Sequence, residues 1–141
     1  MKTSYESKYG NDEDTLNMDY KHTDAYQMCY DLSVYLHKKV TQFPKYEKFT
    51  LQKEIREAID DVMDEIEMYE KTKVASHLYA ADRHKSRLVR KIRLAHDLKY
   101  SAMNNKTYHY VSEQLGYIGG CIGGLINKVR EEKKHRVAVN S

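Results

Sequence analysis

The sequence predicts an all-α protein, an antiparallel up-down-up-down bundle of four helices. Two observations predict it: the 141 residues contain one proline and six glycines, and apolar residues recur at intervals of three and four along four segments. A chain of this length with 40% hydrophobic residues can bury one modest core. These properties exclude a multidomain enzyme.

The first two helices are expected at residues 23–43 and 46–71, on either side of the single proline, Pro44. The core-facing stripe of the first should comprise Ala25, Cys29, Leu32, Leu36, Val40 and Phe43. That of the second should comprise Leu51, Ile55, Ala58, Ile59, Val62, Ile66 and Tyr69. Opposite this second stripe the helix carries Glu57, Asp60, Asp64 and Glu67. An acidic outer face is therefore expected.

The third helix is expected at residues 76–100, a span with seven Lys/Arg and two acidic residues. Its core positions are Leu78, Ala81, Leu88, Ile92, Ala95 and Leu98, and Lys85 falls on the same face. The face away from the core gathers Arg83, Arg87 and Arg90, flanked by Lys91 and Arg93. This is the main basic stripe of the chain.

The fourth helix is expected from Thr107, as N-cap, to about Glu132. Its apolar positions alternate steps of four and three: Val111, Leu115, Ile118, Ile122, Leu125 and Val129. It also carries glycines on two adjacent rows, Gly116, Gly120 and Gly124 on one and Gly119 and Gly123 on the other. Each costs about 1 kcal/mol relative to alanine, so we expect a neighbouring helix to approach this surface closely.

Charge divides the chain into three parts: an acidic mobile leader at residues 1–22, the bundle at 23–132, and a basic flexible tail at 133–141. Residues 1–24 carry three lysines and six acids, although the whole chain has a formal net charge of +3. The first ten residues contain no apolar run typical of a signal peptide, and the two cysteines form no CxxC. We expect a cytoplasmic protein without a membrane span.

Catalytic and metal sites are not indicated. A ferritin-like di-iron site needs two Glu-x-x-His pairs, and one such spacing exists, Glu132 to His135. The acidic cluster in the second helix is better explained as a solvated face, and the GGCIGG run lacks the Lys-Ser/Thr ending of a phosphate loop. Cys29 and Cys121 are expected to be inert thiols. We therefore expect no catalytic residue, no metal and no cofactor.

The basic stripe predicts binding to a polyanion, because guanidinium groups are good phosphate ligands. A secondary basic tail adds Lys128, Arg130, Lys133, Lys134 and Arg136. The alternative is a solvated face whose cations pair with the acidic face of the second helix.

Three groups of residues also resemble a known family. The first is Phe43-Pro44-Lys45 with Phe49-Thr50-Leu51 and Ile55-Arg56, the second Leu78-Tyr79-Ala80-Ala81-Asp82 with Arg93-Leu94-Ala95, and the third Ile118-Gly119 with Gly123-Gly124 and Ile126. Over roughly residues 23–130 the chain resembles the four-helix-bundle family of the accessory variability determinant (Avd) of diversity-generating retroelements. That family includes proteins encoded in intervening sequences of bacterial ribosomal RNA genes. The chain departs from its pattern at Gln52, Lys85, Lys91 and Leu125.

The resemblance implies a protein with no activity of its own that assembles as a barrel-shaped homopentamer with a positive surface. It further implies binding to nucleic acid with little sequence preference and association with the element's reverse transcriptase. Of the stripe residues, Arg93 alone lies on a motif position. The resulting hypothesis is a non-enzymatic accessory protein that presents the third helix to RNA or to an RNA/DNA template-primer. The alternative is a scaffold of the intervening-sequence type that binds proteins and no nucleic acid.

Overall fold

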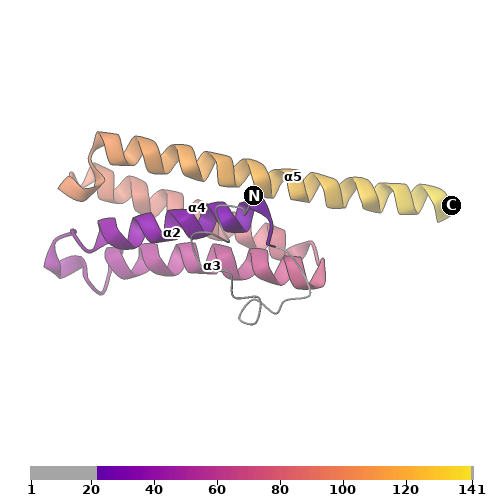
Figure 1. Ribbon diagram of the computed structural model, residues 1–141, viewed down its shortest axis with the longest axis horizontal. Coiled ribbons are helices and arrows are strands. Elements are labelled where there is room, and N and C mark those ends of the chain that lie inside the picture. The colour runs from indigo at the N-terminus through magenta and orange to yellow at the C-terminus, as the bar shows by residue number, and fades with distance from the viewer. Residues whose placement is uncertain (1–21, 141) are drawn as a thin grey trace, which may run out of the picture.

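Four helices form the protein in a computed structural model that describes residues 22–140 (Figure 1). They are α2 (Asp24–Val40), α3 (Leu51–Thr72), α4 (Ser76–Asp97) and α5 (Asn105–Asn140), with 3-10 turns η1 (Lys45–Glu47) and η2 (Ser101–Met103) between them. Successive helices run in opposite directions. α2 and α4 each pack against both α3 and α5. The prediction of an antiparallel four-helix bundle is confirmed, and the acidic leader lies, apart from His22, outside the described residues.

The core lies where the predicted apolar stripes meet. All six predicted positions of α2 and its C-terminal turn are buried, as are the seven of α3. In α4 the prediction fails at Leu98, which is 47% exposed because it follows the last helical residue. In α5 Val111, Leu115, Ile118 and Ile122 are buried, whereas Leu125 and Val129 are half-buried. α5 therefore leaves the core in its second half.

Helix α3 starts later than predicted. Pro44 is followed by the short turn η1, and the α-helix begins at Leu51 instead of Tyr46. The Glu47 side chain explains this start, because its Oε1 accepts hydrogen bonds from the Thr50 hydroxyl and from the Leu51 N–H. These hydrogen bonds lower the pKa of Glu47.

The connection between α4 and α5 also differs from the prediction. α4 ends at Asp97, and Lys99 adopts a left-handed conformation with φ of 62°. Asn104, rather than Thr107, caps α5: its Oδ1 accepts a hydrogen bond from the Thr107 N–H at 3.0 Å. Thr107 itself is buried.

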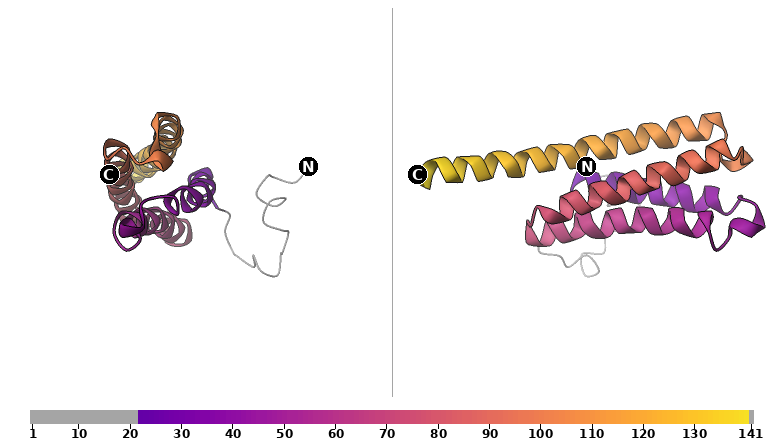
Figure 2. Two further views of the ribbon diagram at one scale, coloured as in Figure 1. Left: turned by 90° about the vertical axis from the view of Figure 1, so that its left-hand side faces the viewer. Right: turned by 180° about the vertical axis from the view of Figure 1, so that it is seen from behind.

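Helix α5 is much longer than its neighbours. Its 36 residues span about 54 Å, whereas the 22 residues of α4 span about 33 Å. Residues 133–140, predicted as part of a flexible tail, continue the helix in the structure. Figure 1 and the right-hand view of Figure 2 show this end projecting beyond the other three helices.

A buried carboxylate holds the start of α2 against the end of α3. Glu70 is 2% exposed. Its Oε2 accepts a hydrogen bond from the Thr23 N–H at 2.5 Å, and its Oε1 lies 2.7 Å from His22 Nδ1. The predicted boundary of the leader is therefore one residue too late, because His22 is already part of the bundle.

The glycines of α5 do not pack as predicted. A Cβ placed on Gly116, Gly120, Gly123 or Gly124 would meet no other part of the described chain within 4 Å. Gly119 differs, because its Cβ would lie 3.0 Å from Lys85 Nζ. Each of these four glycines therefore has open space where a side chain would stand, and no helix within residues 22–140 packs closely against them. Gly116, Gly120 and Gly124 are exposed and Gly123 is half-buried.

Candidate nucleic-acid interface

The cations of α4 point in different directions because the helix packs between α3 and α5. At 100° per residue, the core residue Leu88 lies between Arg87 on the α3 side and Lys85 on the α5 side. Arg83, Arg90 and Arg93 lie on the remaining, solvent-facing side. The predicted stripe therefore consists of two groups with different surroundings.

The first group faces α3 and is neutralised there. Arg87 Nη2 donates a hydrogen bond to Asp61 Oδ2 at 2.6 Å, and Lys91 Nζ lies 3.1 Å from Glu54 Oε1. Both cations are half-buried. The alternative interpretation predicted pairs with the second helix; the partners are Asp61 and Glu54 rather than Glu57, Asp60, Asp64 or Glu67 of its outer face. Arg87 and Lys91 therefore belong to the seam between α3 and α4.

The second group is exposed. In the described part of the chain, no carboxylate forms an ion pair with Arg83 or Arg90. The two lie seven residues apart, which is two helical turns or about 10 Å along the axis. Arg93 Nε is 3.6 Å from Asp97 Oδ2, but its side chain remains 73% exposed. A contact this open is weak and easily exchanged for another anion.

Arg130 of α5 extends this group. Its guanidinium lies 5.9 Å from the ring centre of Tyr79, and its Nε donates a hydrogen bond to the Tyr79 hydroxyl at 3.2 Å. Tyr79 precedes Arg83 by one turn on the same side of α4. We call Arg83, Arg90, Arg93 and Arg130 the outer arginine track.

The other predicted tail residues lie on the projecting part of α5. Lys128, Lys133 and Lys134 are exposed there, as is Arg136. Lys134 Nζ lies 3.8 Å from Glu131 Oε1 in an exposed pair. The tail cations are thus carried on a helix that continues from Arg130 and the outer arginine track.

The outer face of α3 has the opposite charge. Burial, followed by repulsion from Asp60 and Asp61, raises the pKa of Asp64. The repulsive part of this shift comes from the carboxylates that surround Asp64 on α3, which include Asp60, Asp61, Glu65 and Glu67. The bundle therefore separates an acidic face on α3 from a basic face on α4.

The track can bind anions, since exposed guanidinium groups donate hydrogen bonds to phosphate oxygens in a planar, bidentate geometry. Its spacing along one helix suits an extended polyanion. Among residues 22–140, no cluster of three or more His, Cys, Asp or Glu could hold a metal ion. Within the same range, no helix combines the length and apolar character that crossing a bilayer requires.

Sequence reasoning missed two features of this surface. Lys85 lies over Gly119, so a lysine on the core face of α4 is accommodated by a residue without a side chain. The row formed by Gly119 and Gly123 in the sequence of α5 could have indicated this space for Lys85. The contact between Tyr79 and Arg130 joins residues 51 positions apart, and no local pattern indicates it.

Comparison with known families agrees with this architecture. No curated protein matches the chain. The family model described as bAvd-like matches residues 25–129, which covers the four-helix core from the first turn of α2 into the second half of α5. The protein is therefore a four-helix-bundle member of the bAvd-like family, an Avd-type accessory protein.

Proposed function

We propose that the protein is a non-enzymatic accessory factor of a diversity-generating retroelement. It binds RNA, or an RNA/DNA template-primer, and associates with the element's reverse transcriptase to support mutagenic cDNA synthesis. Membership of the bAvd-like family supports the accessory role. The exposed face of α4 supports the nucleic-acid interaction.

The observation that carries the proposal is the separation of the α4 cations into paired and exposed groups. Asp61 and Glu54 neutralise Arg87 and Lys91, while Arg83 and Arg90, two turns apart on α4, remain exposed. The contacts to phosphate should therefore come from Arg83, Arg90 and Arg93, continued by Arg130. Arg87 and Lys91 are removed from the candidate binding residues.

Self-association, expected as a homopentamer, belongs to the same proposal. The outward glycines Gly116, Gly120 and Gly124 leave a surface on which a second copy could approach the α5 backbone closely. Several copies would place several outer arginine tracks in one assembly and multiply the number of phosphate contacts. The native mass of the purified protein tests this directly.

Retention of a structured RNA at several salt concentrations tests the nucleic-acid interaction. A steep loss of affinity with salt supports the proposal. The logarithm of the binding constant should fall with the logarithm of the salt concentration, with a slope of about 0.7 to 0.9 for each phosphate contact. A protein-binding scaffold, the alternative function, should retain no RNA at low or moderate salt. The ion pairs between α3 and α4 favour that alternative only for Arg87 and Lys91.

A further inference from the structure

Two connections meet at one end of the bundle. Residues 41–50 join α2 to α3, and residues 98–104 join α4 to α5. Both lie at the left-hand end of Figure 1, and Figure 2 shows that end face-on. Tyr100 links them: its hydroxyl donates a hydrogen bond to Glu47 Oε2 at 2.6 Å and lies 3.2 Å from the Tyr46 hydroxyl.

This end exposes aromatic rings. Phe49 is 78% exposed and Tyr46 is 76% exposed, the highest values among the large hydrophobic residues of the described chain. Neither ring fills the core at this end, where Phe43 and Tyr100 contact each other in a tilted arrangement with ring centres 5.4 Å apart. A ring this exposed buries little apolar area within the bundle, so most of its surface is open to a ligand.

The charges around these rings are mostly positive. Residues 41–50 and 97–106 together contain Lys45, Lys48, Lys99 and Lys106 and two acids, Glu47 and Asp97. The Asp97 carboxylate is paired, because its Oδ2 lies 3.6 Å from Arg93 Nε. The Glu47 carboxylate accepts hydrogen bonds from Tyr100, Thr50 and Leu51, which satisfies it within the bundle. Lys48 Nζ lies 5.4 Å from the centre of the Phe49 ring. Rings flanked by cations suit an anionic ligand with flat groups.

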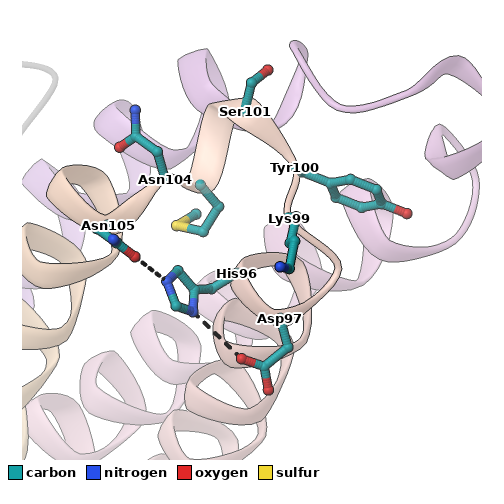
Figure 3. Close-up of a pocket in the computed structure, with 8 residues that line it drawn as sticks. His96, Asp97, Lys99, Tyr100, Ser101, Asn104 and Asn105 are labelled. Atoms are coloured by element: carbon teal, nitrogen blue, oxygen red, sulfur yellow. Dashed lines mark hydrogen bonds and ion pairs between the residues drawn. The ribbon is translucent and has the colours of Figure 1, made fainter.

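An open cleft of about 550 Å³ adjoins the rings at Tyr100. His96 forms part of its wall and stacks on Tyr108 with ring centres 4.1 Å apart. Figure 3 shows its two ring nitrogens engaged: Nε2 lies 2.7 Å from Asn105 Oδ1, and Nδ1 lies 3.4 Å from Oδ1 of Asp97, the acidic residue of the lining. Lys99, Ser101 and Asn104 add polar groups to the lining. The volume lies in the range of sites for small organic ligands.

We propose that this end of the bundle binds unpaired nucleotides of single-stranded nucleic acid, with Phe49 and Tyr46 as stacking surfaces and Lys45, Lys48 and Lys99 as phosphate contacts. Base stacking on aromatic side chains combined with a positive surface is how proteins hold single strands without reading their sequence. The cleft accommodates a base next to those stacked on the rings. This inference rests on the proposed function and adds a second contact site for the same class of ligand.

A single tryptophan provides a direct test, because the natural chain contains none. Phe49→Trp places it on the proposed stacking surface. Val74→Trp is the matched control: Val74 is 49% exposed and follows α3, at the opposite end of that helix from Phe49, about 33 Å away. Oligo(U) should quench the emission of the Phe49→Trp protein and leave that of the Val74→Trp protein unchanged, whereas a blunt RNA duplex should quench neither.

Phe49→Leu separates stacking from simple apolar contact, since leucine keeps an apolar side chain but has no ring. It should weaken oligo(U) binding by about 5- to 150-fold and leave duplex binding unchanged, with native helical content by circular dichroism. Normal oligo(U) binding by Phe49→Leu, or equal quenching of both tryptophans, overturns this site while the outer arginine track stands. A wild-type protein that binds neither oligo(U) nor duplex overturns the proposed function together with the site.

Discussion

Arg87 Nη2 lies 2.6 Å from Asp61 Oδ2 and joins α4 to α3 across the acidic side of the bundle. Arg83, one turn earlier, has no such partner among residues 22–139. Two arginines four residues apart in one helix therefore serve different purposes. The first stabilises the seam, and the second is available to a phosphate.

Alanine substitutions should separate these roles. Arg87→Ala is expected to lower the free energy of unfolding by about 0.5–1 kcal/mol, the upper range for a partly exposed ion pair. Arg83→Ala should change it by less than about 0.5 kcal/mol, since it removes no contact within the described chain. Urea denaturation of both variants measures the difference. A double-mutant cycle of Arg87→Ala and Asp61→Ala should show a coupling energy between the two positions. The corresponding cycle of Arg83→Ala and Asp61→Ala should show none.

The helical period predicts that Arg83, Arg87 and Arg90 share one side of α4, but it cannot distinguish the two edges of that side. Arg87 lies at the edge that meets α3, and its partner Asp61 is 26 residues away in the sequence. The crossing of α3 and α4 decides which cation meets a carboxylate. That geometry depends on packing, which periodicity does not encode.

Glu70 should be the most sensitive charged residue of the bundle. Glu70→Ala removes the acceptor of the Thr23 N–H and the partner of His22. The start of α2 then loses these polar contacts with the end of α3. We expect a loss of about 1–3 kcal/mol in the free energy of unfolding. Glu70→Gln, which keeps one acceptor oxygen, should lose less. Thermal denaturation of the two variants checks the order, and equal stability of Glu70→Ala and wild type would contradict it.

The outward glycines offer a test of self-association. In an isolated chain, Gly120→Ala and Gly124→Ala should each stabilise α5 by about 0.5–1 kcal/mol, because the added methyl groups meet no neighbour. In an assembly that packs on this surface, the same variants should lower the native mass. Light scattering combined with thermal denaturation distinguishes the two outcomes. Gly119→Ala serves as a contrast, since its methyl group would press on Lys85.

Cys29 should resist alkylation in the folded protein. Burial, followed by the influence of Cys121, raises the pKa of the Cys29 thiol to about 12. Iodoacetamide at pH 8 should therefore label the half-buried Cys121 first and reach Cys29 only after unfolding. Because the thiol proton is held more tightly in the folded state, this residue stabilises the fold below pH 9, and the contribution is lost as the pH rises from about 9 to 12. Peptide mass spectrometry after labelling reads the order, and prompt labelling of Cys29 would refute it.

The sequence predicts the helices better than their ends. Apolar spacing indicates each stripe because burial selects side chains by face. The ends depend on single contacts, such as the Glu47 carboxylate that accepts from Leu51 or the Asn104 amide that caps α5. Apolar spacing could not predict that α5 continues past Glu132, because a helical segment exposed on all sides has no apolar stripe.

Charge reversal on the outer arginine track tests the central claim most directly. The double variant Arg83→Glu and Arg90→Glu changes the net charge by the same amount as Lys38→Glu and Lys53→Glu, which alters exposed lysines of α2 and α3. Filter retention of one structured RNA at fixed low salt compares the two with wild type. We expect loss of retention in the arginine variant and near-normal retention in the lysine variant, with native helical content in both. Equal retention by the two variants would contradict it.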